Sequence, residues 1–187
     1  MEVKVNPLLI KPAKNYVFQQ AIKFWTSIIT IGITDKQSAW EKKRTRLLNG
    51  IAAMAFIILS IYCLMYLRQT EGLVFIESFQ GAVAMAIVLL LNRFHKYLAA
   101  CHFFNIYNIL CYSFFAISHG VVDAAEYLLV VGSITSMLFF RNKFIVVSYF
   151  IANGVCFALC KYSFTVMKPF LFMPNGENLF ITNHITM

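Results

Sequence analysis

The sequence predicts an all-α integral membrane helical bundle, with about five transmembrane helices and an amino-terminal interfacial helix. Hydrophobic residues make up 60% of the 187 residues and charged residues 13%, and the mean hydropathy is +0.70. A soluble globular domain is about 45–50% apolar and about 25% charged. Residues 47–67 carry no charge, and about 20 apolar residues rising about 1.5 Å each cross a hydrocarbon core of about 30 Å. These observations exclude an ordinary soluble domain.

Residues 1–46 are expected to form a basic cytoplasmic lead to the membrane domain. Within this lead, residues 16–33 are mostly apolar, are interrupted by a lysine and two glutamines, and contain Trp25. Tryptophan is typical of headgroup depth, so we expect a helix that lies in the inner interface. A helix docked against the bundle from below is the alternative. The basic stretch from Trp40 to Arg46 then leads directly into the first span.

The membrane domain is expected over residues 47–162. Short polar or charged turns divide it into apolar stretches of helix-spanning length. The predicted spans are 47–67, 73–92, 97–117, 121–140 and 144–162. Residues 163–187 contain two prolines and an Asn-Gly pair. We expect this segment to be an extracytoplasmic tail, because it is too polar and too broken to span.

The distribution of lysine and arginine predicts one topology, with the amino terminus in the cytoplasm and the carboxyl terminus outside the plasma (inner) membrane. The inner segments then hold thirteen basic residues, namely Lys4, Lys11, Lys14, Lys23, Lys36, Lys42, Lys43, Arg44, Arg46, Arg93, Lys96, Arg141 and Lys143. The outer segments hold three, namely Arg68, Lys161 and Lys168. A basic stretch directly before a span favours contact with the anionic inner leaflet over nucleic acid, and no nucleic-acid partner is expected.

Polar groups inside the predicted spans are the candidate site, because such groups are costly in a bilayer. Glu77 and Glu126 lie about one turn inside the outer ends of the second and fourth spans. Asn105 and Asn108 share one face of the third span, and Asn153 lies near the middle of the fifth. Converging faces would line an outward-open pocket for a small cationic or hydrogen-bonding ligand, or a proton-sensitive site. Alternatively, the carboxylates reach the outer water and the asparagines join helices, at about 0.6 kcal/mol per hydrogen bond.

The five cysteines all fall inside predicted spans and form no CxxC pair, so no disulfide framework is expected. Cys156 and Cys160 are one helical turn apart and could share a metal, but packing as small apolar residues is the favoured alternative. The sequence contains no HExxH, GxSxG, Gly-rich phosphate loop or paired metal-carboxylate motif. We therefore expect no catalytic, cofactor or metal site in this chain.

The stretch from Trp40 to Asn49 reads WEKKRTRLLN and follows Ile-Gly-Ile-Thr at residues 31–34. Over about residues 30–162 the chain resembles the membrane domain of bacterial multi-pass signalling proteins. In that group a similar entry sequence opens a region of about six spans, followed by a sensor histidine kinase or class III adenylate/guanylate cyclase domain. The sixth span and the output domain have no counterpart here. The resemblance implies an input half that stops before its cytoplasmic output domain.

Two functions of different classes follow. The first is a non-catalytic membrane sensor or input module for signal transduction. Its expected partners are the bilayer with its anionic inner leaflet, a second copy of the chain in a homodimer, and a cytoplasmic signalling domain. The second is a small multi-pass transporter or channel subunit. Solute flux in proteoliposomes would favour the second function over the first.

Overall fold

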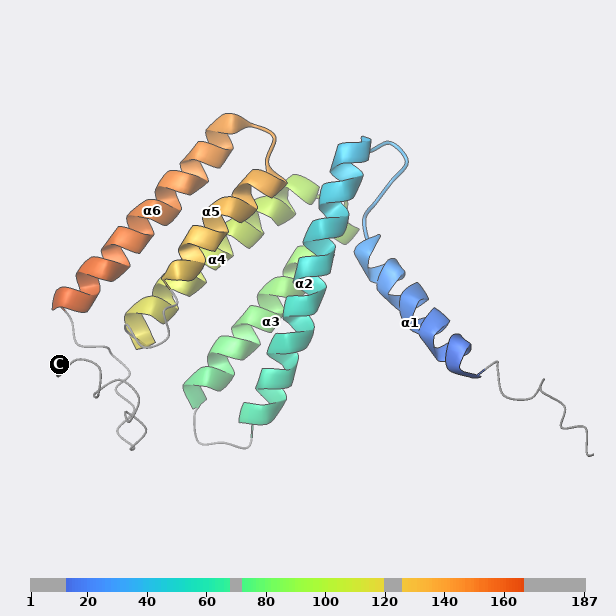
Figure 1. Ribbon diagram of the computed structural model, residues 1–187, viewed down its shortest axis with the longest axis horizontal. Coiled ribbons are helices and arrows are strands. Elements are labelled where there is room, and N and C mark those ends of the chain that lie inside the picture. Colours follow the sequence, from blue (N-terminus) through green and yellow to red (C-terminus); the bar gives the residue numbers. More distant parts are fainter. Residues whose placement is uncertain (1–12, 68–71, 120–125, 167–187) are drawn as a thin grey trace, which may run out of the picture. The chain divides into compact units, whose positions relative to one another are not determined.

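The computed structural model describes residues 13–67, 72–119 and 126–166, and these ranges are helical with short connections (Figure 1). The helices are α1 (Ala13–Ile29), α2 (Ala39–Tyr66), α3 (Gly72–Arg93), α4 (Tyr97–His119), α5 (Tyr127–Phe139) and α6 (Lys143–Val166). By length and apolar composition, α2, α3, α4 and α6 can cross a membrane, whereas α5 has only 13 residues. The chain is therefore an all-helical, multi-pass membrane protein.

The helix bounds differ from the predicted spans mainly at three places. α3 and α4 agree with 73–92 and 97–117 to within two residues. α5 begins only at Tyr127, and residues 121–125 of the predicted fourth span lie outside the described residues. α6 continues to Val166 instead of ending at residue 162. Residues 163–166 of the predicted tail 163–187 therefore belong to α6. Residues 1–12 of the predicted lead 1–46 and residues 167–187 of that tail lie outside the described residues.

The third difference is that α2 starts eight residues before the predicted span, because Ser38 caps it. The Glu41 backbone N–H donates to Ser38 Oγ at 3.3 Å, and the Ser38 backbone N–H donates to Glu41 Oε2 at 2.8 Å. This reciprocal capping box satisfies two N–H groups that a helix start leaves without partners. The basic stretch before the first span is therefore helical and continuous with it.

By its internal contacts the chain divides into two compact units, residues 1–100 and 101–187. The boundary lies inside α4 and within the predicted membrane domain 47–162. In the first unit, α2 and α3 pack as an antiparallel hairpin, and the end of α1 packs against α2. Leu48, Ala52 and Ala53 of α2 are buried, and so are Met85 and Val88 of α3.

A buried polar joint fixes the end of α1 to this hairpin. Asn49 Nδ2 donates to the carbonyls of Ile29 and Ile31, at 3.2 and 2.8 Å, where α1 has just ended. Asn49 Oδ1 accepts from Asn92 Nδ2 of α3 at 2.7 Å. The two asparagines are 0% and 1% exposed. One side chain of α2 therefore holds a loop carbonyl on one side and α3 on the other.

The turn after α3 completes the joint. His95 has a φ of 59° and closes α3 as glycine usually does, its N–H bonding to the Asn92 carbonyl at 2.9 Å. The His95 ring Nδ1 lies 3.1 Å from the Gly32 carbonyl, which assigns a proton to Nδ1 as donor. Gly32 has a φ of +74°, and a Cβ there would lie 1.8 Å from the Asn92 carbonyl oxygen. We name Gly32, Asn49, Asn92 and His95 the asparagine joint.

In the second unit, α5 and α6 form an antiparallel pair. Glu126, just before α5, pairs with Lys161; Gly132 of α5 faces Asn153; and Phe140, just after α5, stacks on Tyr149. As the residue number increases along α5, the number of its partner in α6 therefore decreases. The α4 residues of this unit pack on the pair through side chains. Phe104 meets Phe139 edge-on at 5.6 Å, and Ala116, Leu129 and Cys160 form a buried apolar cluster.

We expect Gly32→Ala to destabilise the protein strongly. A non-glycine residue in the left-handed region costs about 1–3 kcal/mol, and here the new Cβ also meets backbone that cannot rotate away. The measurement is the thermal unfolding midpoint of the purified protein in detergent. Gly154→Ala in α6 is the matched control, since a Cβ there meets no atom within 4 Å. In a helix interior that change stabilises by up to about 1 kcal/mol. Equal midpoints for the two variants would contradict the described joint.

Candidate functional site

The five residues predicted to bind a ligand are all buried, each 9% exposed or less. Glu77 lies on α3 in the first unit. Asn105 and Asn108 on α4, Glu126 before α5 and Asn153 on α6 belong to the second unit. The convergence of all five on one cavity therefore stays a prediction. Within the second unit, the structure pairs Glu126 with a lysine that the sequence indicated only as a topology signal.

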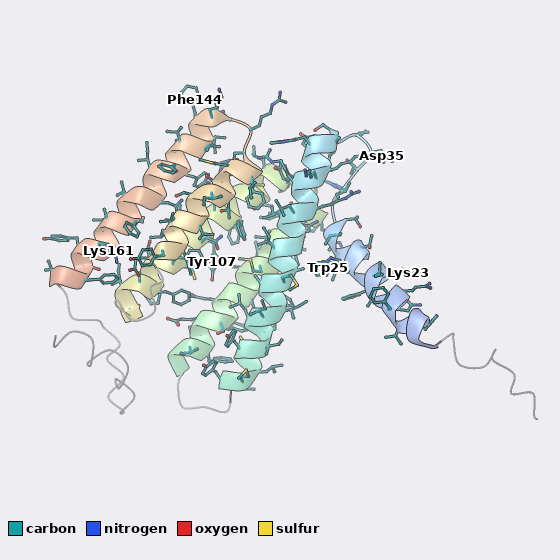
Figure 2. The ribbon with its side chains drawn as sticks, in the orientation of Figure 1. Lys23, Trp25, Asp35, Tyr107, Phe144 and Lys161 are labelled. Atoms are coloured by element: carbon teal, nitrogen blue, oxygen red, sulfur yellow. The ribbon has the colours of Figure 1, made fainter. Side chains whose placement is uncertain are left out.

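That lysine is Lys161, which lies near the carboxyl-terminal end of α6, whereas Phe144 lies at the other end of this helix (Figure 2). Lys161 Nζ donates to Glu126 Oε1 at 2.7 Å. The Glu126 side chain is 0% exposed, and the Lys161 side chain is 39% exposed. Glu126 is therefore buried in this unit, unlike the water-reaching carboxylate of the alternative interpretation. The antiparallel register of α5 and α6 brings the two residues together across 35 positions of sequence.

Three aromatic rings lie near the lysine ammonium. Nζ lies 4.9 Å from the ring centroid of Tyr127, 5.8 Å from that of Phe157 and 5.6 Å from that of Phe164. Tyr127 is the first residue of α5, and the two phenylalanines flank Lys161 on α6 at positions one turn away. A cation within about 6 Å of a ring face is attracted by the ring quadrupole. We name Glu126, Tyr127, Phe157 and Phe164 the aromatic cage.

The hydrogen bonding of Glu126 in the aromatic cage is incomplete among the described residues. A buried carboxylate is costly unless it is paired and hydrogen-bonded, and the Lys161 ammonium satisfies one of its oxygens. The other oxygen, Glu126 Oε2, is buried and has no hydrogen-bond partner among the described residues. Glu126 also sits at the amino-terminal end of α5, where the helix dipole favours a negative charge. The arrangement can hold an ammonium group and has acceptor capacity to spare.

The predicted asparagines do not join helices through the hydrogen bonds described. Asn105 Nδ2 donates to the Cys101 carbonyl at 2.9 Å, and Asn153 Nδ2 donates to the Tyr149 carbonyl at 2.8 Å. Both acceptors lie one turn earlier in the same helix. The asparagines that do connect elements are Asn49 and Asn92. The sequence singles out neither as a contact, because Asn92 is the last residue of a predicted span and Asn49 stands out only in the stretch that carries the resemblance.

Asn153 also marks a close approach between α5 and α6. Its Oδ1 is buried without a partner among the described residues. A Cβ added to Gly132 would lie 2.9 Å from that oxygen. The small residue on α5 thus leaves room for a polar group on α6, as is common where membrane helices pack closely.

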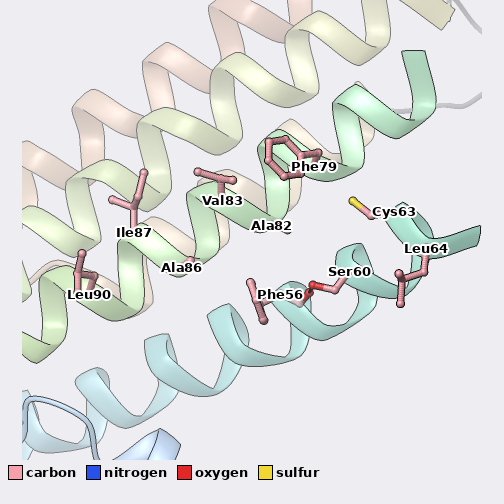
Figure 3. A pocket seen from close by; sticks show the side chains of 10 residues that line it. All are labelled: Phe56, Ser60, Cys63, Leu64, Phe79, Ala82, Val83, Ala86, Ile87 and Leu90. Carbon is pink, nitrogen blue, oxygen red and sulfur yellow. Dashed lines mark hydrogen bonds between the residues drawn. The ribbon is translucent and has the colours of Figure 1, made fainter. Parts of the chain in front are cut away.

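An apolar groove of about 610 Å³ lies between α2 and α3 (Figure 3). The described residues that line it are Phe56, Ser60, Cys63, Leu64, Phe79, Ala82, Val83, Ala86, Ile87 and Leu90. The five predicted ligand residues are not among them. The Ser60 hydroxyl donates to the Phe56 carbonyl at 2.7 Å, so even this polar group is internally satisfied. The groove suits apolar chains and offers little to a charged ligand.

All five cysteines are free, and Cys101 and Cys160 are buried. In the described ranges no three His, Cys, Asp or Glu side chains gather closely enough to hold a metal ion. No protein-family model, curated protein or solved structure matches this chain.

The pairing of Glu126 with Lys161 predicts strong coupling in a double-mutant cycle. Lys161→Met leaves the buried Glu126 carboxylate without its cation, so we expect a lower thermal unfolding midpoint. Replacing both partners, in Glu126→Gln with Lys161→Met, should restore much of that loss. The measurement is the thermal unfolding midpoint of the four proteins in the same detergent. Additive single effects, with no recovery in the double variant, would show that the two side chains do not interact.

Proposed function

We propose that this chain is a non-catalytic multi-pass sensor, the membrane input module of a bacterial signalling receptor. The observation that supports this most is the asparagine joint. A sensor must pass a change in its membrane helices to an element outside the hydrocarbon core. Here Asn49 of α2 holds the end of α1 directly, so a movement of the hairpin acts on α1 through hydrogen bonds of 2.8–3.2 Å. The resemblance of the Trp40–Asn49 stretch to receptor input domains agrees with this function.

The proposal includes an orientation in the plasma (inner) membrane. The end of the first unit that contains the asparagine joint is also its basic end, with Lys43, Arg44, Arg46, Arg93 and Lys96. By the positive-inside rule this end faces the cytoplasm. In this orientation α5 is the fourth of five crossings, the amino terminus is inside and the carboxyl terminus is outside.

α1 then lies at the inner surface of the membrane. Much of its apolar surface is exposed, including Tyr16, Val17, Phe18, Ile22 and Phe24. A helix of this kind binds an interface by burying apolar side chains beside anionic lipid headgroups. Anionic lipid, a second copy of the chain and a cytoplasmic signalling domain are the partners that this placement suits.

In this proposal, α4 transmits the signal between the two units. This helix begins in the first unit with Tyr97 and continues into the second. Tyr97 also approaches Arg44 of α2, with 5.9 Å between the guanidinium carbon and the ring centroid. Movements of membrane helices in signalling proteins are on the order of 1–2 Å, and a continuous helix passes such a shift along its axis.

A single tryptophan on α1 tests this transmission. Trp40→Phe leaves Trp25, labelled on α1 in Figure 2, as the sole tryptophan of the two in the chain. In vesicles, we expect the Glu126→Gln/Lys161→Met pair to change quenching of Trp25 by brominated lipids, as α1 shifts by about 1–2 Å. Adding Asn49→Ala should abolish that change, because the joint is broken.

The control for this experiment is Gly154→Ala, which alters α6 without touching the ion pair and should leave Trp25 quenching unchanged. If folded protein shows the same quenching with and without the Glu126–Lys161 pair, the sensor proposal fails. Solute flux through proteoliposomes of the unmodified chain would instead favour a transporter or channel.

Reporter fusions test the orientation. An exterior-active reporter fused after Met187 should be active, and a cytoplasm-active reporter at the same position should be silent. Fusions at His95, in the turn between α3 and α4, should give the opposite pattern and serve as the internal control. Cytoplasmic activity at both positions would mean an even number of crossings and would contradict the five-span orientation.

A further inference from the structure

We propose that the aromatic cage is a binding site for a small organic ammonium group, and that Lys161 occupies it as a tethered competitor. The inference rests on the proposed function, since it names the class of ligand that the sensor would detect. Three independent features of the second unit point to it: the rings, the spare carboxylate oxygen and the exposure of the lysine.

The rings give the site its chemistry. Tyr127, Phe157 and Phe164 each lie within 4.9–5.8 Å of a single cationic nitrogen. Tyr127 and Phe157 also contact each other, with centroids 5.9 Å apart and planes at 60°. Two or three rings around one cation are the arrangement that proteins use for alkylated ammonium ligands.

The carboxylate supplies the second feature. An ionised carboxylate has about four lone-pair positions, and Lys161 contacts one oxygen of Glu126. Oε2 is fully buried and has no partner among the described residues. A buried acceptor without a donor is unfavourable, so a ligand that brings additional N–H or O–H donors would stabilise the site. Ammonium groups that also carry a hydroxyl or several N–H donors meet this requirement.

The exposure of Lys161 makes exchange feasible. Its side chain is 39% exposed while its carboxylate partner is fully buried. A lysine can turn its ammonium into water while its methylene chain stays against the protein. The lysine ammonium is strongly hydrated, whereas an alkylated ammonium is less so and makes more contact with aromatic rings. The cage can thus pass from the internal cation to an external one without losing its charge balance.

Equilibrium dialysis of radiolabelled choline with full-length protein, in lipid-free detergent, tests the proposal. Removing the tethered cation in Lys161→Met should tighten choline binding by about tenfold or more, because the competitor is gone. Lys161→Gln, which keeps most of the chain length, provides a second variant in case the first does not fold. Phe157→Leu in the otherwise unchanged protein should weaken binding by about fivefold or more. Leu159→Ala, at an exposed position on the same helix, is the control and should bind as the unmodified chain does.

The proposal is overturned if a folded Lys161 variant binds choline no more tightly than the unmodified chain. If neither lysine variant folds, the unmodified chain and Phe157→Leu decide the matter. Saturable binding that Phe157→Leu weakens supports the site, and absence of saturable binding, or binding that Phe157→Leu leaves unchanged, rejects it.

The ammonium could come from a free solute or from a lipid headgroup, and a second arm separates these sources. Binding of free ethanolammonium is compared in nanodiscs of phosphatidylethanolamine and of phosphatidylglycerol. Weaker apparent binding in phosphatidylethanolamine assigns the site to the headgroup, and equal binding assigns it to a free solute. Because binding is measured without reference to α1, its loss overturns the ammonium site alone. Loss of the Trp25 response with binding intact would overturn the sensor function alone.

Discussion

The hydrogen bonds of Asn49 are the constraint on which the first unit depends. A polar side chain buried near the entrance to a span must find partners inside the protein, because hydrocarbon offers none. Asn49 finds them in two carbonyls at the end of α1 and in the amide of Asn92. The same interaction therefore positions the end of α1 and the end of α3. Gly32 allows the close backbone approach that this geometry requires. Apolar packing alone would leave the rotation of α2 and α3 less defined.

In the second unit, an ion pair between Glu126 and Lys161 plays the part that the asparagine amides play in the first. Glu126 is fully buried and pairs with Lys161 at the amino-terminal end of α5, where the helix dipole favours a negative charge. The pair fixes one end of the α5–α6 hairpin, and the stacked rings of Phe140 and Tyr149 fix the other. His102 of α4 joins this second end through the Tyr149 hydroxyl at 2.8 Å. Both units thus use a few buried polar contacts to set the register of otherwise apolar helices.

Hydropathy predicted the helical class, the membrane crossings of α2, α3, α4 and α6, and most helix ends, because uncharged stretches bounded by charges are visible along one chain. The capping box of α2 also has a signature in the sequence, since Ser38 precedes Glu41 by three positions. The partners of Glu126 and Asn49 could not be read in this way. Glu126 and Lys161 are 35 residues apart in the sequence, and Asn49 and Asn92 are 43 residues apart. Whether such residues meet depends on how each helix is rotated about its axis. The helical period shows which residues of a helix share a face, but only the packing of the helices determines which residues that face contacts.

The length of α2 links bilayer geometry to the surface of the membrane. Its 28 residues span about 42 Å, and the uncharged part from residue 47 onward spans about 30 Å, the thickness of a typical hydrocarbon core. A long helix adapts to a thinner bilayer by tilting. With the pivot near mid-membrane, a tilt change of about 10° would carry the Ser38 cap sideways by roughly 4 Å, given the rise per residue of an α-helix. Because Asn49 couples α2 to α1, α1 would follow. A change in membrane thickness would thus alter the tilt of α2 and, through Asn49, the position of α1.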